Sequence, residues 1–300
     1  MTRSLLSFSE PVQNAFKKNK PVVALESSII SQGMPYPQNI QLANRLEEIA
    51  LQNGITPATI CIMNGKIKIG LTDMELELLA KDPDVRKVSS RDIGKVLLDK
   101  KIGATTVSAT MKAADLAGIK VLATGGIGGV HRFAEESFDI SADLIELSHT
   151  PVIVVSAGAK AILDLPRTLE YLETLGVPVY GYKTDDFPAF YSSGSGLKII
   201  RINSAKEIAE IYKKNISLGF KNGILITNPI PGKFEIPYSE MEKFIDMAIK
   251  KSKKKKIKGK ALTPYLLKTL VEITSGRSLD ANVKLVENNV LLACKIAKEF

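Results

Sequence analysis

Short runs of β-branched and apolar residues alternate with segments of helical periodicity along most of this 300-residue chain. The runs at 22–26, 121–124 and 152–156 have the length and composition of buried strands, and each precedes a helical pattern. Parallel strands need a crossover between them, which is usually a helix, so the alternation favours a largely parallel sheet covered on both faces. The sequence therefore predicts a three-layer α/β/α fold with a central, largely parallel or mixed sheet.

The expected elements fill the whole chain, and no low-complexity linker, composition shift or internal repeat divides it. We therefore expect a single domain over residues 1–300. Strands are expected at 22–26, 59–63, 66–70, 105–107, 121–124, 152–156, 179–182, 198–202 and 224–228. Helices are expected at 37–53, 73–80, 91–99, 108–116, 141–147, 159–176, 205–218, 239–254, 264–275 and 282–298.

The composition excludes several classes of protein. Hydrophobic residues make up 45% and charged residues 24% of the chain, which is a globular balance and not a disordered one. Cys61 and Cys294 are the two cysteines, far apart and in no metal-ligand spacing, which indicates a reducing compartment. The beginning of the chain lacks the apolar run of a secretory signal, and no apolar stretch has the length of a membrane span. We expect a cytoplasmic protein without a membrane partner.

The formal net charge is +9, which raises the possibility of a nucleic-acid partner. Much of the excess comes from one lysine run at 250–260, KKSKKKKIKGK. No aromatic residue is interleaved with the run to stack on bases. A solvated helix end is therefore favoured over a nucleic-acid surface, and we expect no nucleic-acid partner.

The first notable strand end carries Glu26, in the string VVALESSIISQGMPYPQN. Ligands of parallel α/β sheets bind beyond the carboxyl ends of the strands, so these ends are where functional residues are expected. A carboxylate at the end of a buried strand is pushed toward its protonated form, which suits a general acid. The alternative is a glutamate that only caps nearby backbone amides.

A second strand ends in the string ATGGIGGVHR, with four glycines between 125 and 129. Such a turn lets the backbone approach a ligand closely, but it matches neither a Walker loop nor the dinucleotide spacing. FDISAD follows, with Asp139 and Asp143 four residues apart. On a helix start these carboxylates either cap backbone amides or hold a hard cation, for which magnesium or manganese is expected in the absence of a His/Cys cluster.

The third strand end reads VIVVSAGAKAILD and places Lys160 in the first turn of an expected helix. A helix N-terminus disfavours a cation and so favours the free amine, which is the nucleophilic form of lysine. Small neighbours leave room for a substrate carbonyl. The alternative is a lysine that extends to solvent. Two further segments place cations or hydroxyl groups at an expected helix start: KVSSRD, which contains Lys87, and GATTVS. Each either binds a phosphate group or only caps its helix.

Taken together, these strings resemble the pseudouridine-5′-phosphate glycosidase family, also described as indigoidine synthase A-like, over residues 21–299. The strings that carry the resemblance include VALESSIISQGMPYPQN, KVSSRD, GATTVSATM, ATGGIGGVHR, FDISADL, SAGAKAILD and NNVLLACKIAKE. By this resemblance Glu26 is the proton donor, Lys160 the Schiff-base nucleophile and Asp139 the ligand of one divalent cation per subunit, usually Mn²⁺, with Mg²⁺ as an alternative. The resemblance also implies substrate-binding positions at Lys87, Val107, Ser141, Ala142 and Asp143, with His131, Thr106 and Asn282 in neighbouring motifs.

The same resemblance implies a homotrimer that reversibly cleaves the C1′–C5 bond of pseudouridine 5′-phosphate to uracil and ribose 5-phosphate. The two-carboxylate chemistry of many glycosidases does not suffice here, because the leaving group is a carbon and not a heteroatom. Attaching ring-opened ribose to a lysine amine avoids this difficulty. The alternatives are another Schiff-base enzyme acting on a sugar phosphate and, less favoured, a basic RNA-binding protein.

Three departures from the family pattern bear on substrate preference. Gln32 stands where the family more often has His, Ser90 where Arg is usual, and Phe133 where Gly is usual. None removes an assigned catalytic group. Phe133 adds bulk beside the glycine-rich turn, and Ser90 removes a cation close to the expected phosphate site.

Overall fold

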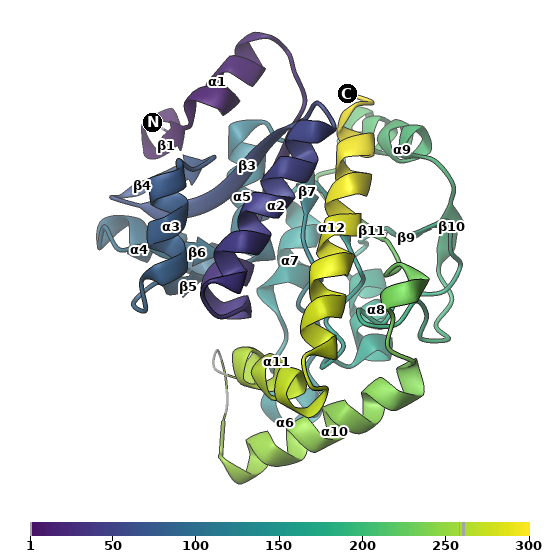
Figure 1. Ribbon diagram of the computed structural model, residues 1–300. Helices are drawn as coiled ribbons and strands as arrows, with labels where there is room; N and C mark the ends of the chain where they lie inside the picture. The colour runs from purple at the N-terminus through teal and green to yellow at the C-terminus, as the bar shows by residue number, and fades with distance from the viewer. Residues whose placement is uncertain (1, 258, 260–261) are drawn as a thin grey trace.

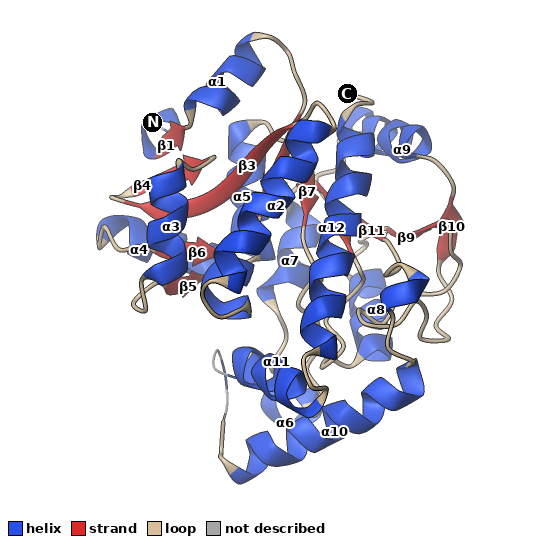
Figure 2. Ribbon diagram, in the orientation of Figure 1, coloured by secondary structure: helices blue, strands red, loops and turns tan. Residues whose placement is uncertain are grey.

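The computed structural model describes residues 2–257, 259 and 262–300, and it confirms the predicted α/β class with a mostly parallel, mixed sheet flanked by helices (Figures 1 and 2). The sheet has the order β1-β4-β3-β2-β7-β8-β11-β9-β10, and β6 pairs with both β3 and β5. The strands are β1 Leu6–Phe8, β2 Val22–Leu25, β3 Thr56–Met63, β4 Lys66–Ile69, β5 Arg86–Val88, β6 Gly103–Thr105, β7 Val121–Ala123, β8 Ile153–Ser156, β9 Val179–Tyr182, β10 Ile200–Ile202 and β11 Ile224–Thr227.

The centre of the sheet is parallel. Strand β7 pairs in parallel with β2 on one side and with β8 on the other, and β8 pairs in parallel with β11. All four residues of β2, of β8 and of β11 are buried, as expected for strands covered on both faces. The carboxyl ends of β2, β7 and β8 therefore lie next to one another at one edge of the sheet.

Strand β3 joins this parallel centre to an antiparallel extension. Its first half pairs in parallel with β2, and Ile60–Met63 pairs antiparallel with β4. Asn64 and Gly65 connect β3 to β4 with φ angles of 53° and 71°. Positive φ at both positions is typical of the type I′ hairpin turn, for which Asn-Gly is the preferred sequence.

Helices cover both faces of the sheet. Figure 1 shows α2 and α12 crossing in front of the strands and α5 and α7 behind them, with α10 and α11 below. The helices are α1 Glu10–Lys17, α2 Gln38–Gln52, α3 Asp73–Lys81, α4 Ile93–Leu98, α5 Val107–Ala117, α6 Ala134–Ser137, α7 Ala142–His149, α8 Leu165–Thr174, α9 Ala205–Ser217, α10 Tyr238–Lys254, α11 Leu262–Ile273 and α12 Arg277–Ala297. No helix in the described part of the chain is long and apolar enough to cross a membrane.

Four short strands and helices were not predicted, namely β1, β5, α1 and α6. Two of them are three-residue strands, too short to show a period, and two of the three residues of β5 are charged because the strand lies at the edge of the sheet. The lysine run at 250–260 begins within α10. Its first residues, through Lys254, end α10, whereas positions 258 and 260 lie outside the described residues.

The prediction of a helix from residue 159 was wrong at its start. Helix α8 begins at Leu165, because the Asp164 side chain caps it by accepting a hydrogen bond from the backbone N–H of Arg167, and Pro166 follows within the first turn. Residues 159–163 instead run beside the glycine-rich segment, with isolated bridges from Ala159 to Ile127 and from Leu163 to His131.

Candidate active site

A cavity of about 600 Å³ lies beyond the carboxyl ends of β2, β7 and β8, within the size range of small-molecule sites. It brings together residues from segments far apart in the sequence. The predicted residues that line it are Glu26, Lys87, Thr106, His131, Asp139, Ser141, Ala142, Asp143, Lys160 and Asn282. The sequence therefore located this cavity at the correct edge of the sheet.

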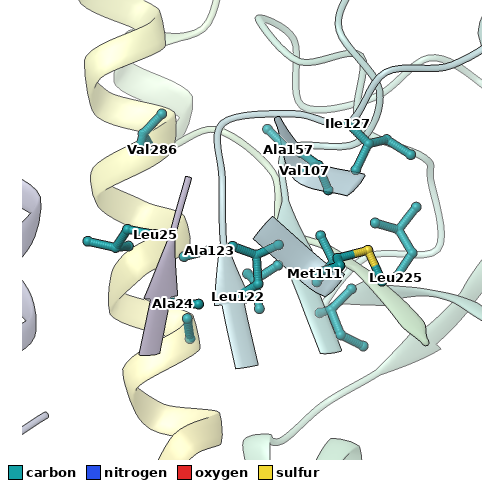
Figure 3. Packing of buried hydrophobic residues seen from close by; sticks show 14 of the residues in the cluster. Ala24, Leu25, Val107, Met111, Leu122, Ala123, Ile127, Ala157, Leu225 and Val286 are labelled. Atoms are coloured by element: carbon teal, nitrogen blue, oxygen red, sulfur yellow. The ribbon is translucent and has the colours of Figure 1, made fainter. Parts of the chain in front are cut away.

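Val107 is the predicted residue that does not line the cavity. Its side chain is 1% exposed and belongs to the main hydrophobic cluster, where Figure 3 draws it with Ile127 and Ala157. Its neighbour Thr106, the N-cap of α5, lines the cavity instead. A substrate contact of Val107 stays a prediction.

Glu26 follows β2 directly and is 6% exposed. Both of its carboxylate oxygens accept hydrogen bonds from hydroxyl groups at 2.5 Å, Oε1 from Thr124 and Oε2 from Ser28. The two donors come from different segments, since Thr124 follows β7. The carboxylate therefore has a fixed orientation at the cavity, and it accepts no hydrogen bond from a described backbone amide, although the alternative interpretation required one.

Asp143 lies in the first turn of α7, and its carboxylate is fixed by backbone groups. Oδ1 accepts from the N–H of Ser108 and Oδ2 from the N–H of Gly128, each at 2.8 Å. The carboxylate thus ties α5, α7 and the glycine-rich turn together. Asp139 lies outside this helix, so the prediction that both aspartates stand on one helix start, four residues apart on the same face, was wrong.

The glycines of the turn are required by close packing. A Cβ on Gly126 would lie 2.6 Å from the ring of Phe190, and one on Gly128 would lie 2.2 Å from Oγ of Ser141. Real Cβ atoms do not approach other heavy atoms this closely, so only glycine fits without a shift of its neighbours. The turn is therefore shaped by what packs around it.

Lys160 lines the cavity from the loop between β8 and α8, and not from a helix. The argument from a helix N-terminus therefore fails for this residue. Its backbone is well anchored, because its N–H donates to the carbonyl of Ile127 at 3.0 Å and its carbonyl accepts from the N–H of Leu163 at 3.0 Å. The loop holds the lysine at the cavity without a helix dipole.

His131 lies close to three charged residues of the cavity. Burial lowers the pKa of His131 below its ordinary value, the cations Lys87 and Lys160 lower it further, and Asp139 opposes them. A neutral imidazole near neutral pH follows from this environment. Lys87, Asp139 and Lys160 line the same cavity as His131.

Asp139 has the properties of a metal ligand that relies on water. No group of three or more His, Cys, Asp or Glu side chains that could hold a metal ion occurs among the described residues. The Asp139 carboxylate accepts no hydrogen bond from residues that the structure describes, while its backbone carbonyl accepts from the N–H of His131. A single free carboxylate facing an open cavity fits a hard cation that keeps most of its waters.

Other lining residues were missed by the sequence analysis. Thr124 and Ser28 stand within quoted motifs, but no local pattern indicated that they would meet at Glu26. Thr263, Pro264 and Leu267 of α11 close another side of the cavity, and nothing in their sequence indicated this. Asn282 lines the cavity, and its Oδ1 has no hydrogen-bond partner among the described residues although Asn282 is only 8% exposed.

Known proteins are similar to this chain over nearly its whole length. The family model described as indigoidine synthase A like protein matches residues 11–299. Two proteins named pseudouridine-5′-phosphate glycosidase are similar throughout: that of Caldanaerobacter subterraneus is 56% identical, covering 98% of this chain and 96% of the relative, and that of Petrotoga mobilis is 53% identical, covering 100% and 98%.

Two solved structures share the fold. An indigoidine synthase A-like protein from Thermotoga maritima has 40% sequence identity and a TM-score of 0.87, with 93% of each chain covered. The prealnumycin C-glycosynthase AlnA, solved in complex with ribulose 5-phosphate, has 36% identity and a TM-score of 0.89, with 98% of this chain and 97% of that chain covered. The chain therefore belongs to the indigoidine synthase A like family, as its motifs predicted.

Proposed function

We propose that this protein is a pseudouridine-5′-phosphate glycosidase, which reversibly splits the C1′–C5 bond of its substrate into uracil and ribose 5-phosphate. One observation carries the proposal: Lys160 and Glu26 line the same cavity, beyond the carboxyl ends of β8 and β2, the two parallel strands that flank β7. The names of relatives more than 50% identical over the full chain support it. So does the ribulose 5-phosphate bound to a structural relative, which is a pentose phosphate.

The chemistry needs an amine and a proton donor. The uncharged amine of Lys160 attacks C1′, and the C1′–O bond of the ring breaks. The nitrogen gives up one proton and the departing ring oxygen takes one up, so the new secondary amine has a lone pair. The nitrogen lone pair then forms the C1′=N bond while the C1′–C5 bond breaks, and its electron pair is captured by a proton at C5 of uracil. Water hydrolyses the imine, which releases ribose 5-phosphate and restores the lysine.

Glu26 is the proposed acid and base of this sequence. Its carboxyl group gives a proton at the leaving group and recovers one from the water that attacks the imine. The hydroxyls of Thr124 and Ser28 hold both of its oxygens, so the proton is delivered in a defined direction. The unpartnered Oδ1 of Asn282 offers an acceptor for an N–H group of the base.

Lys87 is the proposed phosphate contact, together with cavity hydroxyls such as Ser89, and binding energy from this remote group supports the reaction at C1′. Asp139 would hold one divalent cation, Mn²⁺ or Mg²⁺, largely through water. Such a cation orients bound oxygen atoms and neutralises negative charge. We further propose that the protein is a cytoplasmic homotrimer, in agreement with the family resemblance.

The decisive experiment is borohydride reduction in the presence of ribose 5-phosphate, followed by mapping of the modified lysine. We expect the adduct on Lys160, and we expect Lys160→Ala to release no uracil from pseudouridine 5′-phosphate. Lys206→Ala is the control, because that side chain is 75% exposed on α9. Labelling of another lysine, or full activity of Lys160→Ala, contradicts the mechanism.

A second arm separates the proposal from its nearest alternative. Incubation with ketose phosphates in place of pseudouridine 5′-phosphate tests for a general sugar-phosphate lyase. Release of free uracil from the nucleotide, with no cleavage of the ketose phosphates, supports the glycosidase.

A further inference from the structure

Arg132 lies next to the cavity residue His131, but it does not itself line the cavity. Its guanidinium group is directed toward α10 and is only 22% exposed. The catalytic proposal gives this side chain no role. Its contacts nevertheless join the glycine-rich segment, the Lys160 loop and α10.

The first contact is with α10. Arg132 donates from Nη1 to Oε2 of Glu242 at 3.0 Å and from Nη2 to Oε1 at 2.7 Å, and its Nη1 lies 3.7 Å from Oδ1 of Asp246. A paired fork of this kind fixes the geometry of both groups more tightly than a single ion pair does. No other cation of the described residues lies within ion-pair distance of either carboxylate.

The second contact is with the loop of the reactive lysine. Nη2 of Arg132 also donates to the backbone carbonyl of Ala161 at 3.4 Å. Ala161 directly follows Lys160, and the loop beyond it is bridged to His131 through Leu163. One guanidinium group therefore holds both α10 and the peptide next to the proposed nucleophile.

The residue that follows Arg132 adds a second attachment of α10. Phe133 has a φ of 66°, and Nζ of Lys253 lies 3.5 Å from the centre of its ring. A cation over an aromatic face is attracted to it. The departure at Phe133 thus puts an aromatic contact to α10 where the family usually has glycine.

Helix α10 matters to the cavity through its partner. Helices α10 and α11 pack together, and α11 contributes Thr263, Pro264 and Leu267 to the cavity wall. A shift of α10 relative to the Lys160 loop would therefore change both the position of the amine and the wall that faces it. Arg132 donates hydrogen bonds both to α10, at Glu242, and to the Lys160 loop, at Ala161.

We propose that Arg132 is a positioning residue for Lys160. Through its paired hydrogen bonds to Glu242 and its hydrogen bond to Ala161, Arg132 fixes the lysine loop relative to α10. The inference rests on the proposed function, because its readout is the turnover of pseudouridine 5′-phosphate. Removing the fork leaves two neighbouring carboxylates on α10 without a cation and frees the carbonyl of Ala161. The amine of Lys160 then samples positions from which it does not reach C1′.

The test compares Arg132→Met with Arg277→Met. Arg277 donates to Glu240 at 2.6 Å and so also fastens α10, but it does not contact the lysine loop. We expect Arg132→Met to lower kcat on the order of 10- to 100-fold, because an error of about 1 Å in the position of a reacting group costs about this much. KM should change by a smaller factor, since Lys87 is untouched. Arg277→Met should keep the wild-type kcat.

Two further variants keep the test decisive. Arg132→Lys retains the charge without the planar fork, so its kcat should fall between those of wild type and Arg132→Met even if the methionine variant folds poorly. Glu242→Gln should lower kcat, and the double variant Arg132→Met/Glu242→Gln should lose less than the product of the single effects.

The outcomes separate the two proposals. A folded Arg132→Met with the kcat of Arg277→Met, while wild type releases uracil, overturns the role of Arg132 and leaves the proposed function standing. Wild-type protein that releases no uracil overturns the proposed function, and the role of Arg132 falls with it.

Discussion

Oγ1 of Thr124 donates a hydrogen bond to Oε1 of Glu26 at 2.5 Å, although 98 positions separate the two residues in the chain. Each follows a strand of the parallel centre, Glu26 after β2 and Thr124 after β7, and these strands are neighbours. Since parallel neighbours end at the same edge, the sheet itself brings the hydroxyl to the carboxylate. The orientation of the proposed acid is thus set by the backbone register.

Thr124→Val should therefore lower kcat by about 10-fold or more, because a hydrogen bond to a charged group contributes about 1.5–3 kcal/mol. Valine keeps the shape of threonine but does not donate to Glu26. Steady-state release of uracil measures the effect, and Thr124→Ser should recover most of it. Thr174→Val, which removes a hydroxyl from the exposed end of α8, is the control. Equal turnover in Thr124→Val and wild type would remove Thr124 from the mechanism.

Asp143→Asn should reduce the free energy of unfolding by about 1–3 kcal/mol, because one buried N–H loses its acceptor. An amide offers one oxygen, whereas both oxygens of Asp143 accept from backbone N–H groups, those of Ser108 and Gly128. Urea denaturation followed by circular dichroism measures the change. Asp185→Asn removes an ion-paired carboxylate that is 66% exposed, and it should cost much less. Equal stability of the two variants would contradict the prediction.

Gly128→Ala should destabilise the protein by roughly 1–3 kcal/mol and lower turnover, because its Cβ would lie 2.2 Å from Oγ of Ser141. The matched control is Gly94→Ala on α4, where a Cβ meets nothing within 4 Å. That variant should be slightly more stable than wild type, since alanine favours a helix over glycine. Thermal denaturation of both variants checks the prediction. Equal stability of Gly128→Ala and Gly94→Ala would contradict it.

Glu47→Gln should become more stable relative to wild type as the pH rises from 4 to 7. Burial raises the pKa of Glu47 above its ordinary value of 4.5, and the hydroxyl of Thr59 only partly opposes this. Glu47 therefore binds a proton more tightly in the folded protein than in the unfolded chain. As the pH rises and Glu47 loses its proton, the free energy of unfolding of wild type decreases. This loss of stability disappears as the pH falls. Glutamine keeps an acceptor for Thr59 without the charge. Denaturation curves of both proteins at several pH values measure the difference, and a constant difference would refute the argument.

Removal of divalent cations should abolish turnover, and Mn²⁺ should restore it. The free carboxylate of Asp139 is the proposed ligand, so Asp139→Asn should need far more Mn²⁺ for activity. Titration of Mn²⁺ into chelator-treated enzyme, followed by uracil release, measures both effects. Unchanged activity in the presence of a strong chelator would exclude the cation from the reaction.

Local patterns were sufficient for most of the elements. The three-layer class, the parallel centre and ten of the helices were predictable, because apolar periodicity records which face of an element is buried. The start of α8 was misplaced by six residues, from 159 to 165, although Asp164 and Pro166 are ordinary signals of a helix start. The small residues before them were taken for helix, whereas Ala159 and Leu163 form bridges to the glycine-rich segment, with a turn at 161–162 between them.

The sequence by itself determined which residue types stand at the strand ends, including Glu26 after β2 and Lys160 after β8, and hence where the cavity would be. Only the tertiary structure decided which side chains meet there. The contact of Thr124 with Glu26 and the fork from Arg132 to Glu242 join residues about 100 positions apart. Such contacts follow from strand order and from the packing of helices against the sheet, and no period within a single element encodes them.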